Sequence, residues 1–179
     1  YNREEIVAWQ VENEPLLDTF GLCPDGDEDF LKQEISLVKS MDKHRDIIIS
    51  ASGELSTWSH ETKLADIFGT TMYRVVWNPW FRYFRYPIPA WFYKVKADIL
   101  GVSTEHMIIS ELQAEPWVPN GTLSDQTYLE SSKSFDLEQF IANLEFAIKV
   151  DFKQSYLWGV EWWYQQFQNG HPEYWEVAR

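Results

Sequence analysis

Short apolar runs alternate along this chain with stretches whose apolar residues recur at helical spacing, and this alternation constrains the fold more than any other feature. The runs occupy residues 6–11, 46–50, 71–77, 107–112 and 155–160. Most of them are continuously apolar, which is typical of parallel strands buried on both faces of a sheet. The pattern predicts an α/β fold in which about five parallel strands alternate with helices.

The stretches between these runs predict the helices. Gly101 follows one of them and Gly69 another, and a glycine just past a helix is a common stop signal. A right-handed series of such units forms either an open doubly wound sheet or a (β/α) barrel. Helices are expected at residues 28–41, 58–68, 89–100, 135–150 and from about 171 onward.

Size and composition narrow the class of protein further. The 179 residues include no Pro-, Gly- or Ser-rich linker, so residues 1–179 are expected to form a single domain. The net charge of −13 disfavours binding to nucleic acid, whose phosphates would be repelled. Cys23 is the single cysteine and the four histidines are scattered, so the sequence predicts no internal disulfide and no metal site.

Polar and acidic residues follow the apolar runs, where parallel β/α folds bind their ligands. The first run leads into Asn13 and Glu14, the second into Glu54, the third carries Tyr73 and the fourth ends at Glu111. Aromatic residues make up 17% of the chain, including 10 Trp, and such rings stack on the apolar faces of sugars. Two carboxylates at strand ends among aromatic side chains indicate acid/base chemistry on a glycoside.

The residues around these two acids resemble the clan A glycoside hydrolases, which are (β/α)8 barrels. The segment Trp9-Gln10-Val11-Glu12-Asn13-Glu14-Pro15 is similar to the fourth-strand motif of that clan, and Ile108-Ile109-Ser110-Glu111 is similar to its seventh-strand end. Met72-Tyr73 resembles the sixth-strand end, and Trp158 falls where the clan often has an eighth-strand Trp. The order and spacing agree over almost the whole chain.

The resemblance implies a role for each matching residue. Glu14 would be the general acid/base, Glu111 the nucleophile and Tyr73 the side chain that holds Glu111. Asn13 would contact the sugar 2-hydroxyl, and Trp158 would lie beneath the sugar. The chain would then be the C-terminal portion of the barrel without its strands 1–3, with two unpaired sheet edges that predict low stability or activity for the chain on its own.

Other residues compete for these roles or extend the site. Glu115 lies four residues after Glu111 and is its rival as nucleophile, although it follows the strand end and is held less rigidly. Adjacent strand residues point to opposite faces, so Trp158, Trp162 and Trp163 cannot all face one site, and Trp162 is the second choice after Trp158. Trp117 and Glu54 are further candidates for contacts with the substrate, while Glu54 has an equally simple explanation as a loop or cap acid.

The sequence therefore predicts a retaining glycoside hydrolase that cleaves O-glycosidic bonds of an oligosaccharide or glycoside by double displacement, with two Glu residues and no cofactor. The alternative is a non-catalytic carbohydrate-binding or membrane-associated barrel. Residues 77–93 combine many aromatic side chains with Arg82 and Arg85, a composition that suits a substrate-binding wall, a membrane interface or a partner surface.

Overall fold

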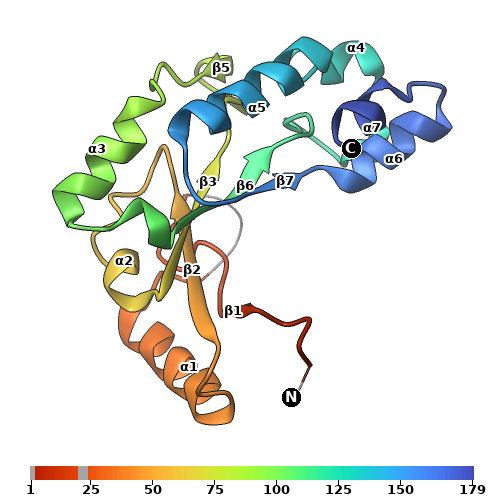
Figure 1. The fold of residues 1–179 in the computed structure, drawn as a ribbon. Helices are drawn as coiled ribbons and strands as arrows, with labels where there is room; N and C mark the ends of the chain where they lie inside the picture. The colour runs from red at the N-terminus through yellow and green to blue at the C-terminus, as the bar shows by residue number, and fades with distance from the viewer. Residues whose placement is uncertain (1–2, 20–23) are drawn as a thin grey trace.

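The computed structural model describes residues 3–19 and 24–179, so Cys23 lies outside the described residues. Five strands form one parallel sheet in the order β1-β2-β3-β6-β7. The sheet curls into a half-barrel, with helices following its strands around the outside (Figure 1). The predicted α/β fold, a partial (β/α)8-type barrel, is confirmed. The strands are β1 (Ala8–Gln10), β2 (Asp46–Ser52), β3 (Ile67–Met72), β6 (Met107–Gln113) and β7 (Ser155–Trp158).

Three of the helices match their predicted positions closely. These are α1 (Glu28–Met41), α3 (Trp91–Leu100) and α5 (Leu137–Val150). The Asp27 side chain caps α1 by accepting from the backbone N–H groups of Asp29 and Phe30, and Gly101 ends α3 with a φ of 70°. Charged-residue caps and a left-handed terminal glycine are the local signals that set helix ends.

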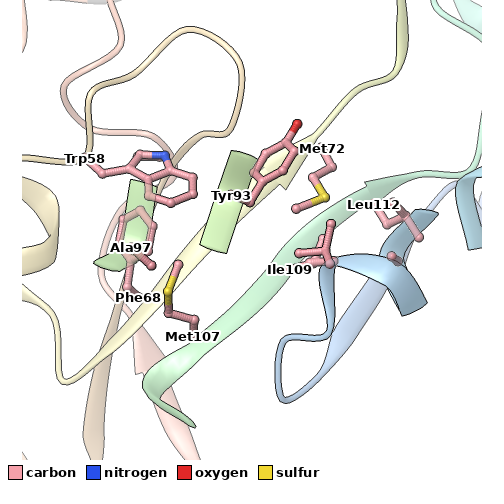
Figure 2. Packing of buried hydrophobic residues seen from close by; sticks show 11 residues of the cluster. Trp58, Phe68, Met72, Tyr93, Ala97, Met107, Ile109 and Leu112 are labelled. Carbon is pink, nitrogen blue, oxygen red and sulfur yellow. The ribbon is translucent and has the colours of Figure 1, made fainter. Parts of the chain in front are cut away.

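The main core lies between the sheet and the helices that cover its outer face (Figure 2). Phe68 and Met72 of β3 pack there with Met107 and Ile109 of β6, and Tyr93 of α3 covers them. A second cluster packs Leu31 of α1 against Ile47 and Ile49 of β2. Because alternate residues of these strands fill the outer core, the residues between them face the inside of the curve.

The predicted helix over residues 58–68 is wrong. Only α2 (Glu61–Leu64) is helical there, and β3 begins at Ile67. Gly69 does not stop a helix but lies inside β3, where an added Cβ would stand 2.9 Å from the Ser110 Cβ. Trp58 and Phe68, the two ends of the expected helix, instead meet in the core from a loop and a strand, with ring centroids 5.1 Å apart.

The predicted strand over residues 71–77 is in fact the end of one strand and the start of another. β3 ends at Met72, and β4 (Val75–Asn78) pairs antiparallel with β5 (Arg82–Arg85) as a hairpin. Between them, the Arg74 guanidinium donates to the backbone oxygens of Tyr86 and Ile88, which ties the base of the hairpin to the start of α3. The aromatic segment is therefore an ordered hairpin and not an extended loop.

The last predicted strand is too long, and a helix after it was not predicted. β7 ends at Trp158, Gly159 adopts a φ of 151° and α6 (Val160–Gln168) follows at once. No side chain fits at Gly159, because its Cβ would lie 2.4 Å from the Ala114 backbone oxygen.

The short α7 (Glu173–Val177) follows α6, close to the predicted start of the last helix. The remaining elements are α4 (Tyr128–Ser131) and the 3-10 helices η1 (Thr104–His106) and η2 (Leu123–Asp125).

Candidate active site

The carboxyl ends of β1, β2, β3 and β6 surround a cleft of about 370 Å³. Four carboxylic acids line it together with aromatic, apolar and small polar side chains. The lining residues are Asn13, Glu14, Ser52, Glu54, Leu55, Thr71, Tyr73, Val76, Tyr86, Glu111, Gln113, Glu115, Pro116, Trp117 and Val118. Six of the eight predicted site residues therefore lie around one cavity, and Trp158 and Trp162 do not line it.

Glu111 lies near the end of β6, and its side chain is held from the neighbouring strand. The Tyr73 hydroxyl, one residue past the end of β3, donates to Glu111 Oε2 at 2.7 Å. Only 8% of Glu111 is exposed. Burial, followed by the charge of Glu111, raises the pKa of Tyr73, which therefore stays protonated and keeps donating.

Glu14 follows the short edge strand β1, and side chains from β2 and β3 hold it. Its backbone N–H donates to Ser50 Oγ at 3.0 Å, and its Oε1 accepts from the Thr71 hydroxyl at 2.7 Å. Its φ of 47° lies in the left-handed region, which is uncommon for a residue other than glycine. Such a conformation needs support from its surroundings, and Ser50 and Thr71 supply it.

The two acids lie on either side of Thr71. Thr71 is the register partner of Glu111 across the β3–β6 ladder, and neighbouring strands lie about 4.8 Å apart. Burial raises the pKa of Glu14, the Thr71 hydrogen bond partly offsets this, and the charge of Glu111 raises it further. The surroundings therefore favour the protonated form of Glu14 more than water does.

Asn13 belongs to a small polar network at the same edge. Ser50 Oγ donates to Asn13 Oδ1 at 3.0 Å, and Gln10 Nε2 donates to the same oxygen at 3.2 Å. The Asn13 side chain is exposed at the cleft, so its amide can meet a ligand there. This network fixes the loop between β1 and Glu14.

Glu54 and Glu115 are the other two acids of the cleft. Tyr93 donates to Glu54 Oε1 at 2.8 Å, and Trp158 Nε1 donates to Glu115 Oε1 at 3.1 Å. Burial raises the pKa of each carboxyl to about 7 in spite of these hydrogen bonds. Trp158 therefore reaches the site through its hydrogen bond to Glu115.

The aromatic candidates separate into three groups. Trp117 lines the cleft and meets Tyr73 edge to face, with ring centroids 5.6 Å apart. Trp158 is half-exposed outside the cleft lining, beside Glu115. Trp162 is not on a strand, as predicted, but on α6, where it is buried against Phe135 and Tyr174. Its burial in this core removes it from the residues that we carry forward.

The hairpin contributes only its base to the cleft. Of residues 77–93, Tyr86 lines the cavity, whereas Trp80 and Phe81 at the hairpin tip are 89% and 71% exposed. No helix among the described residues is long and apolar enough to cross a membrane. The described residues also contain no group of three or more His, Cys, Asp or Glu that could hold a metal ion.

Sequence reasoning missed Thr71 and the part that Ser50 plays. The apolar run over residues 71–77 put Thr71 at the beginning of a strand, although the resemblance put Met72-Tyr73 at a strand end, and Thr71 is the penultimate residue of β3. Ile67 to Met72 contains β-branched and aromatic residues around Gly69, and reading this segment as the strand would have placed Thr71 next to the site.

Comparisons with known proteins show the fold. No protein-family model matches the sequence, and no curated protein does. Among solved structures, the chain is similar to the FMN-binding β-glucuronidase from Facaelibacterium prausnitzii L2-6, with a TM-score of 0.55 and 16% sequence identity. The match covers 86% of this chain and 22% of that one, so the chain spans about a fifth of the neighbour's length.

Proposed function

We propose that the protein is a retaining glycoside hydrolase of the clan A type, with Glu111 as nucleophile and Glu14 as acid/base. The observation that carries this proposal is the pair of acids around Thr71, one of them held by Tyr73 and the other by Thr71 itself. The solved structure with a similar fold is named a β-glucuronidase, which supports a reaction on glycosides. The likeness of residues 9–15 and 108–111 to the clan motifs supports the assignment of the two acids.

The hydrogen bonds distinguish the two oxygens of each carboxyl group. Tyr73 occupies Glu111 Oε2, so Oε1 would attack the anomeric carbon, and Thr71 occupies Glu14 Oε1, so Oε2 would carry the proton. In the first step, the bond from Glu111 to the anomeric carbon forms, the glycosidic bond breaks and Glu14 protonates the leaving oxygen. In the second, Glu14 takes a proton from water, whose oxygen attacks the same carbon and releases Glu111.

Asn13 and Trp117 are the substrate-binding residues that we carry forward from the cleft lining. Asn13 would contact the sugar 2-hydroxyl, and the Trp117 ring would pack on a sugar face. Trp158 would act at the rim of the cleft, where it is half-exposed. Glu54 would accept or donate a hydrogen bond to a sugar hydroxyl, depending on its protonation.

The four acids of the cleft favour a neutral substrate over an anionic one. Glu54 and Glu115 have pKa values of about 7, so both become negatively charged as pH rises through neutrality. A uronide carboxylate would be repelled by these charges, although the neighbour's name refers to a glucuronide. We therefore expect kcat/KM for a neutral pyranoside to exceed that for the matching uronide, with a ratio that grows between pH 6 and pH 8.

The test is hydrolysis of a panel of nitrophenyl glycosides by the protein and two variants. We expect at least one glycoside to be cleaved with retention of anomeric configuration. Proton NMR of the first product formed would show its configuration. Glu14→Gln should lose roughly 10²- to 10⁴-fold in kcat with a poor leaving group and much less with an activated one. Glu115→Gln is the matched control, because it changes a carboxyl of the same cleft that takes no part in the proposed steps.

Cleavage with inversion, or equal activity in Glu14→Gln and the protein, would overturn the mechanism. Binding of glycans with no hydrolysis of any glycoside would favour the non-catalytic barrel, in which the exposed aromatic tip of the hairpin serves as a binding surface.

A further inference from the structure

Thr71 is a buried side chain whose hydroxyl donates to the carboxyl group of Glu14. It is 1% exposed, and its hydroxyl donates to Glu14 Oε1 at 2.7 Å. Its backbone oxygen accepts from the Gly53 N–H at 3.0 Å, next to Glu54 in the wall of the cleft. Thr71 is thus fixed by the sheet, by the β2 end and by its register with Glu111.

We propose that Thr71 is the positioning residue of the acid/base: its hydroxyl holds one oxygen of Glu14, leaves the other to exchange the proton and stabilises the ionised form that the second step requires. This inference rests on the proposed function. It assigns to Thr71 a task that neither the sequence motifs nor the comparisons assign.

The electrostatic surroundings explain why such a donor is needed. Burial and Glu111 both raise the pKa of Glu14, and the Thr71 hydrogen bond is the contact that lowers it. Without that bond the pKa of Glu14 would be higher, so at a given pH a larger fraction of Glu14 would be protonated and unable to act as the base of the second step. A hydroxyl suits this task, because it favours the carboxylate without adding a positive charge that would block protonation.

The titratable groups around Glu14 come from several elements. Glu111 faces Glu14 from β6, and Tyr73 lies near Glu14 just after the end of β3. Glu54 and Glu115 share the cleft with it, and the hollow on its other side is also acidic. The acids that line that second hollow are Glu12, Asp25, Asp27 and Glu34. Every one of these groups is a carboxyl or a phenol, so each of them favours the protonated form of Glu14 or leaves it unchanged.

The first test is a carbon-13 NMR titration of the Glu14 carboxyl, assigned by the loss of its signal in Glu14→Gln. We expect Thr71→Val, which keeps the shape but not the hydroxyl, to raise the pKa of Glu14. Thr71→Ser, which keeps the donor, should leave the pKa close to that of the unsubstituted protein. Thr71→Ala provides the same test if Thr71→Val does not fold, as judged by its melting curve.

The second test is kinetic and separates positioning from a merely structural role. In Thr71→Val, the alkaline limb of kcat/KM should move to higher pH, and kcat with a poor leaving group should fall about tenfold. With an activated leaving group, the first step should be nearly unaffected, and in a Glu14→Gln background Thr71→Val should cost nothing further. Thr71→Ser should restore both the limb and the rate.

The two proposals fail in different ways. If the protein is active and Glu14 titrates identically with and without the Thr71 hydroxyl, the inference about Thr71 is overturned and the proposed hydrolase function still stands. An equal loss of rate at every pH and for every leaving group overturns it as well. A clear shift of Glu14 in a protein that hydrolyses no glycoside overturns the proposed function.

Discussion

The two acids of the cleft are held in different ways. Glu111 lies within the seven-residue strand β6, which pairs with β3 on one side and β7 on the other. Glu14 lies beyond the three-residue strand β1, which pairs with β2 alone, and its backbone is in a left-handed conformation. The backbone ladder positions Glu111, whereas individual side chains position Glu14. In the proposed mechanism, the sheet thus fixes the group that would bond to carbon, and side-chain hydrogen bonds fix the group that would exchange protons.

The largest expected effect comes from removing the better-held acid. Glu111→Gln should reduce kcat by more than about 10⁴-fold, because no carboxylate would remain to form the bond to the anomeric carbon. Substrate binding should be largely retained, since the amide has the same shape, and calorimetric titration of the variant checks this. Glu115→Gln, measured in parallel, should keep most of the activity. A loss as severe as that of Glu111→Gln would mean that Glu111 has no role that Glu115 lacks, and would contradict the prediction.

A smaller loss is expected when the strand is kept and only the contact with Tyr73 is removed. Tyr73→Phe deletes the hydroxyl that donates to Glu111 Oε2, and a hydrogen bond to a charged group contributes about 1.5–3 kcal/mol. We expect kcat/KM to fall roughly 10- to 100-fold, measured with the best substrate of the panel.

Tyr93→Phe is the matched control for this change. Tyr93 also donates to a glutamate at the cleft, Glu54, at 2.8 Å, but that acid has no part in the proposed bond making. The loss should therefore be several times smaller than in Tyr73→Phe. Equal losses in the two variants would mean that Tyr73 contributes packing and not a specific hold on Glu111.

The support of Glu14 can be weakened from β2. Ser50→Ala removes the oxygen that accepts the Glu14 backbone N–H and that donates to Asn13. We expect kcat to fall about 3- to 10-fold with a poor leaving group, because a net contribution of about 1 kcal/mol to the loop geometry is lost. Ser110→Ala is the control on the same curved sheet, since Ser110 Oγ is buried and has no hydrogen-bond partner among the described residues. An unchanged kcat in Ser50→Ala would show that Ser50 is not needed to position the loop that carries Glu14.

The smallest expected effect concerns stability and the two acids that take no part in bond making. The folded-state pKa of Glu54 and of Glu115 is about 7, above the value of about 4.3 in an unfolded chain. At these two groups the folded state therefore binds more protons between these values, so their contribution to the free energy of unfolding should decrease as pH rises from about 4.3 to 7. Melting curves of Glu54→Gln and Glu115→Gln, compared with those of the unsubstituted protein, should show that each variant loses less stability, or gains more, as pH rises over this range. The same dependence of melting temperature on pH in the variants and in the unsubstituted protein would contradict this prediction.

Much of the fold could be predicted because its signals are local. Asp27 marks the start of α1, Gly101 the end of α3, and the apolar residues of β2 and β6 lie in uninterrupted runs. The region from Trp58 to Trp77 could not be read in this way. There, tertiary packing puts Trp58 and Phe68 in one core, and the need for close contact between strands explains Gly69. Neither cause is visible in hydrophobic spacing.

The candidate site was predictable to the same extent. Glu14, Glu111 and Tyr73 stand in segments with a recognisable motif, and the structure brings all three to one cleft. Thr71 was missed because the apolar run was taken to begin at Thr71, whereas β3 begins at Ile67 and ends at Met72. Trp162 was included because the strand was extended through Gly159, whose backbone in fact turns the chain into α6.

The covalent intermediate gives the most direct test of the account. The protein would be incubated with a 2-deoxy-2-fluoro glycoside of the sugar that it cleaves best, carrying an activated leaving group, and then digested for peptide mass spectrometry. Our account predicts one attached sugar per chain, on Glu111, and none on Glu111→Gln. A sugar attached to Glu115 or Glu14, or rapid turnover with no attached sugar at any time, would contradict the assignment of Glu111 as the nucleophile.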